Sequence, residues 1–244
     1  MQATTSRIAL VTGANKGIGF EIARQLGQAG ARVLVGARDR ERGEHAVAAL
    51  RAEHIDARYV RLDLTDPSAI KTAAADVGQQ DGRLDILVNN AGISSPGDGS
   101  PGVANLDAIR RTFDTNFFGT LAVTQAMLPL LRRSASGRIV NVSSGLGSLT
   151  HNGDPKSELA GVRLTGYNAS KAALNMLTVQ LAAELRPAGI KVNSADPGFT
   201  ATDLNGHRGH QTIPQGAAAA IRLALLPDDG PTGSFFSAGG QEPW

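Results

Sequence analysis

Short apolar runs and longer amphipathic stretches alternate along the whole chain of 244 residues. The apolar runs have the length of buried strands, and the amphipathic stretches repeat apolar positions every three or four residues, as helices do. Strands are predicted at residues 7–11, 32–35, 58–62, 84–88, 138–142, 190–194 and 234–237. Helices are predicted at residues 18–29, 40–53, 67–78, 103–132, 166–186 and 214–225.

This alternation is typical of βαβ units, in which neighbouring strands are parallel. Because such crossovers are right-handed, helices cover both faces of the sheet. We therefore expect an α/β fold, a doubly wound parallel sheet of about seven strands of the Rossmann type, in one domain over residues 1–244. Ligands of such sheets bind beyond the carboxyl ends of the strands, where every motif described below lies. Segments 94–102 and 206–211, rich in glycine and polar residues, are expected to be mobile loops.

A glycine-rich segment, residues 12–19, separates the first predicted strand from the first predicted helix. Strand, glycine loop and helix in this order favour a dinucleotide-binding loop over an ordinary turn. Gly13 allows the tight turn, Gly17 lets the backbone approach a pyrophosphate at the helix N-terminus, and Gly19 permits close packing. The other positions of the loop expected to contact the cofactor are Asn15, Lys16 and Ile18.

Tyr167 and Lys171 lie four residues apart within a predicted helix. Residues at this spacing share one helix face, so the phenol and the ammonium can meet. A cation beside a phenol favours the phenolate, which would make Tyr167 a usable acid or base near neutrality. Such a pair also occurs on many solvated helices, and the spacing alone does not separate the two interpretations.

Composition excludes several classes of function. The net charge is only +2 and the basic residues are dispersed, so no nucleic-acid partner is expected. Cysteine is absent, which excludes disulfides and thiolate sites and is in keeping with a cytoplasmic protein. No apolar run reaches 18 residues, so no membrane span is expected. The five histidines lack metal-ligand spacing with carboxylates, so no metal site is expected, and His207 and His210 are expected to face solvent.

Seven motifs in the order found here resemble the short-chain dehydrogenase/reductase family. They are the glycine loop, Asp63-Leu64, Asn89-Asn90-Ala91-Gly92, Asn116, Ser143-Ser144, Tyr167 with Lys171, and Pro197-Gly198. They span residues 12–202, so the resemblance covers most of the chain.

The resemblance implies a catalytic tetrad of Asn116, Ser144, Tyr167 and Lys171. Reduction of a carbonyl needs a proton and hydrogen bonds for the developing alkoxide. Tyr167 would donate the proton and Ser144 would hold the substrate oxygen, while Asn116 would anchor a proton-relaying water. We choose Ser144 over Ser143 because the family's serine directly precedes a turn such as residues 145–147.

The resemblance also implies the cofactor contacts. Asp63 and the Leu64 backbone would hold the adenine, although Asp63 could instead be a turn aspartate. Asn90, Ala91 and Gly92 would line the ribose side, and Asn89 would stiffen the sheet. Contacts around the nicotinamide and its ribose are expected from Tyr167, Lys171, Pro197 and Gly198. The Thr200 backbone and the Thr202 hydroxyl would meet the carboxamide and the phosphates.

The end of the second strand indicates which cofactor is used. An NAD enzyme of this fold places a carboxylate there, whereas this chain has Ala37 followed by Arg38. Arginine suits a phosphate, and Lys16 adds a second positive charge, so NADPH/NADP+ is expected. A shift of two residues would instead make Asp39 the carboxylate of an NAD site.

The sequence therefore predicts an NADPH-dependent reductase of a small ketone or aldehyde, similar to the carbonyl-reductase branch of the family and reversible in principle. Two alternatives are a nucleotide-sugar epimerase or dehydratase and a non-enzymatic NAD(P)-sensing regulator.

Between Ser144 and Tyr167, the turn-forming residues 148–156 predict a loop beside the active site. This loop is expected to set substrate specificity or to be a surface excursion. It could also obstruct a homodimer through the following helix, so monomer and dimer both stay open.

Overall fold

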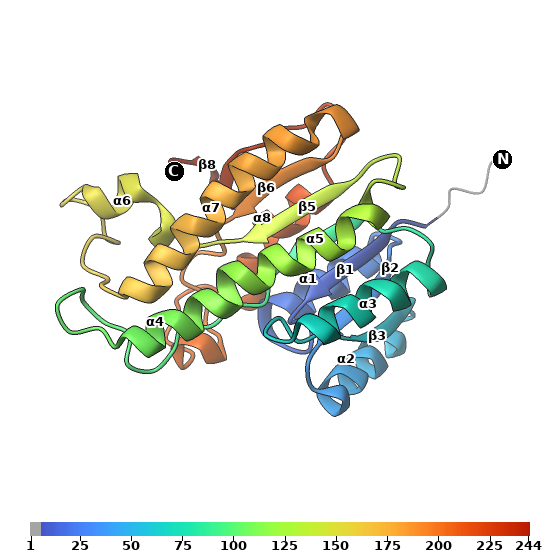
Figure 1. The fold of residues 1–244 in the computed structure, drawn as a ribbon, viewed down its shortest axis with the longest axis horizontal. Coiled ribbons are helices and arrows are strands. Elements are labelled where there is room, and N and C mark those ends of the chain that lie inside the picture. The colour runs from blue at the N-terminus through green and yellow to red at the C-terminus, as the bar shows by residue number, and fades with distance from the viewer. Residues whose placement is uncertain (1–5) are drawn as a thin grey trace.

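The computed structural model describes residues 6–244. Eight strands form one sheet in the order β3-β2-β1-β4-β5-β6-β7-β8, with β3 and β8 at its edges (Figure 1). The strands are β1 Ile8–Thr12, β2 Arg32–Ala37, β3 Ala57–Arg61, β4 Ile86–Asn89, β5 Arg138–Val142, β6 Lys191–Ala195, β7 Phe235–Ser237 and β8 Gly240–Glu242. Strands β1 to β7 are parallel, which confirms the doubly wound α/β fold.

The prediction of about seven strands missed β8, which pairs antiparallel with β7. Ser237 pairs with Gly240, so Ala238 and Gly239 form a two-residue hairpin. Gly240 has φ +140°, a conformation that glycine adopts most easily. A strand of three residues is too short for its alternation to be recognised in the sequence.

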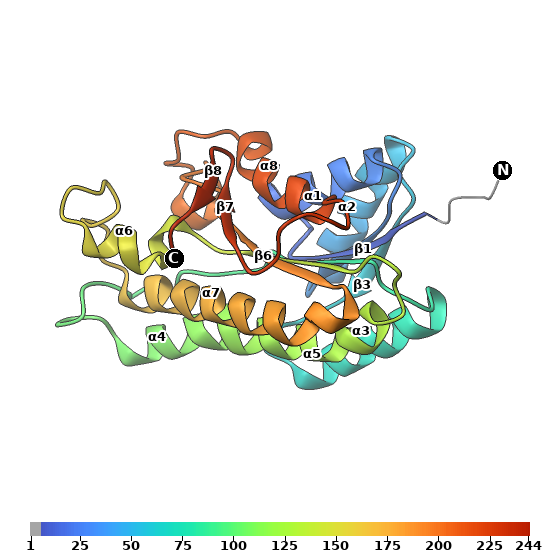
Figure 2. The same ribbon diagram turned by 90° about the horizontal axis from the view of Figure 1, so that it is seen from above.

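Helices cover both faces of the sheet (Figure 2). The helices α1 Gly17–Gln28, α2 Arg40–Ala52 and α8 Ile213–Ala224 lie on one face, and α3 Pro67–Gln80, α4 Leu106–Phe113, α5 Thr120–Leu131 and α7 Thr165–Leu185 lie on the other. Because side chains alternate along a strand, Ala9 and Val11 of β1 enter one apolar core, while Ile8 and Leu10 enter the second.

The single helix predicted at residues 103–132 is wrong in two respects. It begins at Leu106, because Asn105 Oδ1 accepts the free N–H groups of Asp107 and Ala108 at 2.8 and 3.1 Å. It is also interrupted by a π-helical turn, Asp114–Gly119, between α4 and α5. The apolar periodicity continues through this turn, so the pattern carries no mark of it. π-turns occur frequently at functional sites, and this one contains Asn116.

The segment between Ser144 and Tyr167 is not composed of turns alone. A 3-10 turn, Gly145–Gly147, is followed by a short helix, α6 Leu149–Gly153, capped by the Ser148 hydroxyl. Asn168 donates to the Val162 carbonyl at 2.9 Å, so the segment rests on the first turn of α7. Further along α7, Met176 and Val179 are 58% and 38% exposed, so the segment does not cover this part of the helix. Within the described part of the chain, no helix has the length and apolar character needed to cross a membrane.

Candidate active site

The glycine loop lies at the carboxyl end of β1. Gly13 and Gly17 have φ values of +66° and +57°, which disfavour any residue with a side chain. A Cβ on Gly19 would lie 2.6 Å from the Gly13 carbonyl oxygen, so glycine is required there as well. Lys16 directly precedes α1, and Gly17 and Ile18 begin it. The first N–H groups of this helix point toward the place where an anion would bind. This backbone cradle fits a pyrophosphate.

Asn90 braces the glycine loop from the neighbouring strand. Its side chain donates to the Thr12 carbonyl at 2.9 Å, and the Thr12 hydroxyl accepts the Asn90 and Ala91 N–H groups at 3.0 and 2.9 Å. Asn89 instead points into the protein, where it donates to Asn141 and Thr124 at 2.8 and 3.0 Å. Asn89 thus ties the sheet to α5, the structural role expected of it.

Lys171 lies one turn after Tyr167 on α7. Its Nζ is 5.6 Å from the centre of the Tyr167 ring and donates to the Val142 carbonyl at 2.8 Å. Burial lowers the pKa of Lys171 to about 8, while the nearby Asp196 carboxylate raises it. A Cβ on Gly92 would lie 3.4 Å from Nζ and 3.3 Å from Asn116 Oδ1, so these three residues converge closely.

In this structure, burial outweighs the acidifying effect expected of Lys171 on the phenol. Burial raises the pKa of Tyr167 to about 12, the Ser144 hydroxyl opposes this shift and Asp196 adds to it. The physical reason is that the loss of hydration destabilises the phenolate by more free energy than the neighbouring groups supply in stabilising it. The phenol therefore keeps its proton at neutrality, which is the form needed to donate one to a carbonyl oxygen.

The two serines at the end of β5 face different surroundings. Ser143 is buried and its hydroxyl donates to the Lys171 carbonyl at 3.4 Å, which makes it part of the interior. The Ser144 hydroxyl accepts the Leu146 N–H at 3.2 Å and faces the Tyr167 phenol. The structure therefore brings Ser144 together with Tyr167, as predicted.

Asn116 is buried within the π-turn. Its Oδ1 accepts the Ile93 N–H at 2.8 Å, and its Nδ2 donates to the Ile93 carbonyl at 2.9 Å and to Ser170 Oγ at 3.0 Å. The side chain is thus fully used in holding the segment after β4 against α7.

Asp98 is a site residue that the sequence does not reveal. Its two carboxylate oxygens accept the N–H groups of Gly166 and Tyr167, each at 2.9 Å. Since these groups belong to the first turn of α7, Asp98 caps the helix at the residue that carries the phenol. The segment 94–102 carries no motif, so its contact with α7 could be found only from the fold.

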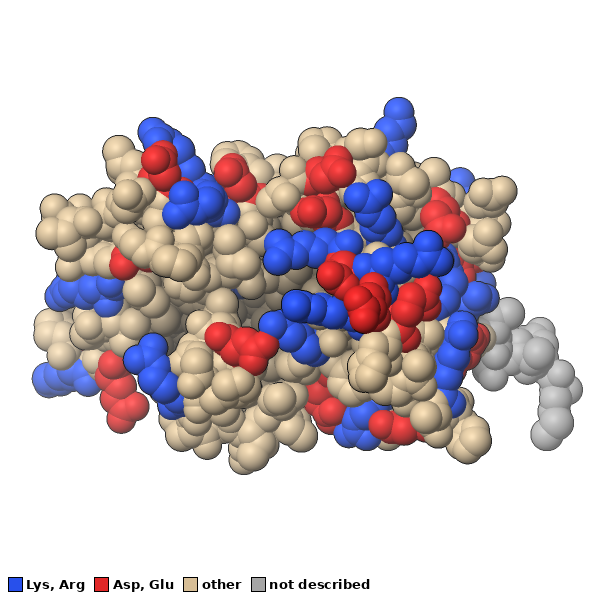
Figure 3. Space-filling model, turned by 90° about the horizontal axis from the view of Figure 1, so that it is seen from below, with Lys and Arg blue, Asp and Glu red and all other residues tan. Residues whose placement is uncertain are grey.

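The basic side chains near the end of β2 include one more than predicted. Arg61 is paired with Ala37 in the sheet register, and both Arg38 and Arg61 lower the pKa of Asp63, after hydrogen bonds from Thr65. The Asp39 carboxylate caps α2 by accepting the Arg42 N–H at 2.9 Å, so it is turned toward that helix. On the side of the molecule shown in Figure 3, Lys and Arg side chains border a central hollow.

Asp63 forms the turn that was one of the two interpretations given for it. Its Oδ1 accepts the Thr65 N–H at 3.0 Å and the Thr65 hydroxyl at 2.8 Å, as in a turn. The next residue, Leu64, has its carbonyl against Gly119 of the π-turn, where a Cβ would come within 2.6 Å. The pair therefore lies between the end of β3 and the π-turn.

The segment after β6 closes the other side of the site. Gly198 has φ +63°, and the Thr202 methyl lies 4.0 Å from the position of a Cβ on Gly17, so the two loops face each other. Lys16 forms an exposed ion pair with Asp203, which also accepts from His207 at 2.8 Å. The hydrogen-bonding groups of the Thr200 backbone are already paired, with the Gly198 carbonyl and the Asn205 amide.

Segment 206–211 is packed more firmly than a mobile loop. Gln211 pairs with Thr200 in a parallel bridge, and a Cβ on Gly198 would lie 2.7 Å from the Gln211 side chain. His207 and His210 are exposed, as expected. Among residues 6–244, no group of three or more His, Asp or Glu side chains is placed to hold a metal ion.

A parallel sheet with a glycine cradle at β1 and a Ser144–Tyr167–Lys171 group at β5 and α7 is the arrangement of a Rossmann-type oxidoreductase. The family model described as short chain dehydrogenase matches residues 7–212. The chain belongs to the short-chain dehydrogenase family.

Named relatives indicate the chemistry found within this family. The chain is 35% identical to (+)-neomenthol dehydrogenase of Arabidopsis thaliana, over 97% of this chain and 98% of the relative. It is also 35% identical to carbonyl reductase [NADPH] 1 of Mus musculus, over 97% and 98%. The solved structure of NADPH-bound carbonyl reductase from chicken fatty liver superposes with a TM-score of 0.84 at 30% identity, over 98% of this chain and 99% of that one.

Proposed function

We propose that this protein reduces the carbonyl group of a small ketone or aldehyde with NADPH, and can run the reaction in reverse. The observation that carries the proposal is the meeting of Ser144, Tyr167 and Lys171 opposite the glycine cradle. The relatives named as dehydrogenases and reductases favour this function over a nucleotide-sugar epimerase or a non-enzymatic regulator.

The residues present fit NADPH. The positive φ values of Gly13 and Gly17 and the lack of room for a side chain at Gly19 form a cradle for the pyrophosphate. Arg38 follows β2 and Arg61 ends β3 beside it, which supports a phosphate-binding role next to the adenosine ribose. A guanidinium binds a phosphate through two parallel hydrogen bonds. When bound, NADPH supplies the hydride that the carbonyl carbon accepts.

Side chains of this protein bind the carbonyl oxygen of the substrate and supply its proton. Ser144 donates a hydrogen bond to the carbonyl oxygen, and the protonated Tyr167 phenol transfers its proton to that oxygen as negative charge develops. Lys171 holds a positive charge beside the ring and stabilises the phenolate that remains. Asp98 and Asn116 fix the positions of α7 and of the segment after β4.

Replacement of Tyr167 by phenylalanine tests this function. Tyr167→Phe removes the proton donor but keeps the ring, so kcat should fall at least ~10²-fold, the range that general acid catalysis contributes. The dissociation constant for NADPH, measured by fluorescence titration, should change little. The control is Tyr59→Phe, because Tyr59 donates to the Ala37 carbonyl at 3.1 Å, away from the catalytic group. Near-normal turnover of Tyr167→Phe would refute the assignment.

A further inference from the structure

Asp196 is a partly buried carboxylate at the active site that the proposed reaction does not use. It directly follows β6, and its N–H donates to the Phe236 carbonyl at 2.7 Å. Its Oδ1 accepts the Gly198 N–H at 2.9 Å. Its Oδ2 lies 3.1 Å from the position of a Cβ on Gly145, the residue after Ser144. Only because Gly145 has no side chain does the carboxylate reach the turn that carries the catalytic serine.

The charged and polar groups around Asp196 come from both sides of the site. The charge of Asp196 affects the pKa values of Tyr167 and Lys171 on α7. The charges of His151 on α6 and Glu242 on β8, which contact each other at 3.1 Å, act in turn on Asp196. Burial raises the pKa of Asp196, whereas the Gly198 and Gly145 backbones lower it and Glu242 raises it again. The carboxylate therefore lies between the catalytic group and the wall formed by α6 and the carboxyl-terminal hairpin.

The hydrogen-bonding capacity of Asp196 exceeds what the fold uses. A carboxylate offers about four acceptor positions, and the backbone of the two neighbouring turns occupies only part of them. The methyl group of Leu159, from the segment after α6, lies 2.8 Å from the same Cβ position on Gly145, so the carboxylate has an apolar neighbour. A polar group in such surroundings gains most from a donor that the ligand brings with it.

We propose that Asp196 selects carbonyl substrates that carry a hydrogen-bond donor, a hydroxyl or a protonated amine, on the carbon next to the carbonyl. The carbonyl oxygen would bind Ser144 and Tyr167, and Asp196 Oδ2 adjoins the turn that directly follows Ser144. A donor on the carbon next to the carbonyl would then be the substrate group nearest to the carboxylate. This inference rests on the proposed reductase function. It adds the class of substrate, namely α-hydroxy and α-amino ketones.

The test compares four matched ketones under NADPH: acetophenone, 2-hydroxyacetophenone, 2-aminoacetophenone and its trimethylammonium analogue, which carries the charge without a donor. For each enzyme, kcat/KM of a ketone is divided by kcat/KM of acetophenone. Comparing this ratio between the wild type and each variant removes the intrinsic reactivities of the ketones. The variants are Asp196→Asn, which keeps one acceptor oxygen, and Asp196→Leu, which keeps none. The control is Asp154→Asn, an exposed aspartate in the loop after α6 whose Oδ1 accepts the Lys156 N–H.

In Asp196→Leu, the ratios for the hydroxy and amino ketones should fall about 10- to 100-fold, the effect of one hydrogen bond to a charged group. In Asp196→Asn, the amino ketone should lose more than the hydroxy ketone. A change in the pKa of Tyr167 or Lys171 alters kcat/KM for acetophenone and the other ketones alike, so it cancels in the ratios. Asp154→Asn should match the wild type.

Unchanged ratios in Asp196→Asn would overturn the inference even if the leucine variant does not fold. An equal loss for all four ketones, or a trimethylammonium ratio that falls as much as the amine ratio, would overturn it too. If the wild type reduces none of the ketones while still binding NADPH, the proposed function fails, which is a different result from lost selectivity.

Discussion

The pKa of Lys171 lies much closer to neutrality than that of an ordinary lysine, because burial lowers it to about 8. The ammonium form stabilises the phenolate left after proton transfer, and this form is lost as the pH rises through 8. Tyr167, with a pKa of about 12, stays protonated over the same range. We therefore expect kcat/KM for ketone reduction to be level below about pH 7 and to fall tenfold per unit well above pH 8.

This pH profile can be measured with a single ketone between pH 6 and 10. A profile that stays flat to pH 10 would show that the charge of Lys171 is not required. Lys171→Arg serves as the comparison, because the guanidinium stays protonated throughout this range and should remove the break near pH 8 from whatever activity remains.

Arg38 and Arg61 should set the preference for the phosphorylated cofactor. Arg38→Ala is expected to raise KM for NADPH at least about tenfold, equivalent to the loss of one charge-assisted hydrogen bond of about 1.5–3 kcal/mol. KM for NADH should change little, and adding Arg61→Ala should deepen the loss. Asp39→Asn is the control, since Asp39 caps α2 and should leave the preference intact. An Asp39→Asn enzyme that loses NADH activity selectively would instead favour an NAD site.

The sequence predicts those site residues whose roles depend on spacing within one segment. The glycines of residues 12–19 and the pair Tyr167 and Lys171 are of this kind, and their positions agree with expectation. Asp98, Asp196 and Arg61 come from segments without a motif and reach the site only through packing. The pKa of Tyr167 could not be predicted for the same reason, because it depends on burial.

At the scale of elements, the least expected contact is the one that Asp98 makes with the first turn of α7. Asp98→Ala would leave the Gly166 and Tyr167 N–H groups without their acceptor, costing about 0.5–2 kcal/mol of helix stability. Small displacements of a catalytic group cost up to ~10²-fold in rate, so we expect kcat to fall roughly 10- to 100-fold, with NADPH affinity retained. Steady-state kinetics and fluorescence titration measure the two effects.

Asp98→Asn separates positioning from charge, because the amide oxygen still accepts one of the two N–H groups and should restore part of kcat. Asp154→Ala is the matched control, since it removes a similar aspartate turn that does not contact α7. Loss of NADPH affinity in parallel with kcat would indicate general unfolding of this region rather than misplacement of the phenol.

Elements were predicted correctly where a long apolar face marks them, as in α1 and α7. The π-turn at Asp114–Gly119 preserves the apolar periodicity while shifting the backbone hydrogen bonds, so only coordinates reveal it. The helix α6 has five residues, and β8 has three. Both are shorter than the windows in which periodicity can be read.

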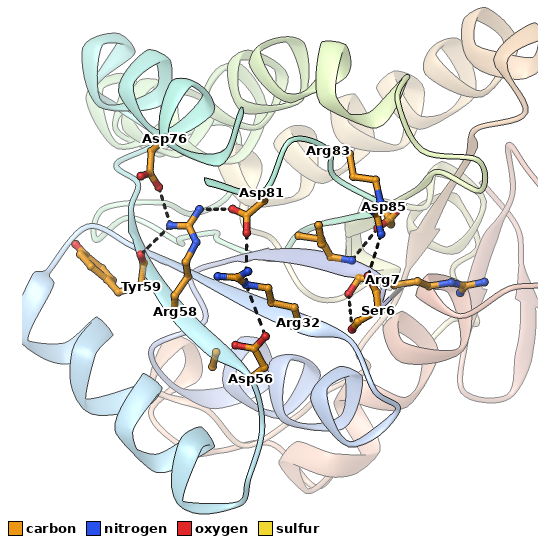
Figure 4. Close-up of polar contacts among 12 residues, drawn as sticks. Ser6, Arg7, Arg32, Asp56, Arg58, Tyr59, Asp76, Asp81, Arg83 and Asp85 are labelled. Atoms are coloured by element: carbon orange, nitrogen blue, oxygen red, sulfur yellow. Dashed lines mark hydrogen bonds and ion pairs between the residues drawn. The ribbon is translucent and has the colours of Figure 1, made fainter. Parts of the chain in front are cut away.

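Across the whole molecule, the end of the sheet opposite the active site is held by an ion-pair network (Figure 4). The Asp81 carboxylate, fully buried at the end of α3, pairs with Arg58 of β3 and, at 3.4 Å, with Arg32 of β2. Asp76 pairs with the same Arg58 at 2.6 Å but is 41% exposed. Asp81 thus joins one helix to two strands without contact with solvent.

Asp81→Ala should lower the free energy of unfolding by about 3 kcal/mol, at the low end of the ~3–5 kcal/mol range for breaking a buried pair, because Arg58 keeps some exposure. Asp76→Ala removes an exposed partner of the same arginine and should cost no more than about 1 kcal/mol. Urea unfolding followed by circular dichroism measures both. Equal losses in the two variants would show that burial of Asp81 is unimportant.

The two edge strands of the sheet affect the tendency of the protein to aggregate at high concentration. An exposed edge strand offers unpaired N–H and C=O groups on which a second molecule can add its own strand. Here β8 provides only three residues for such pairing, and β3 carries the charged side chains of Arg58 and Arg61. If two β3 edges met, the positive charges of Arg61 would face each other, whereas Arg58 is already paired with Asp76 and Asp81. The sheet that positions the active site is therefore also protected against growth into fibrous aggregates.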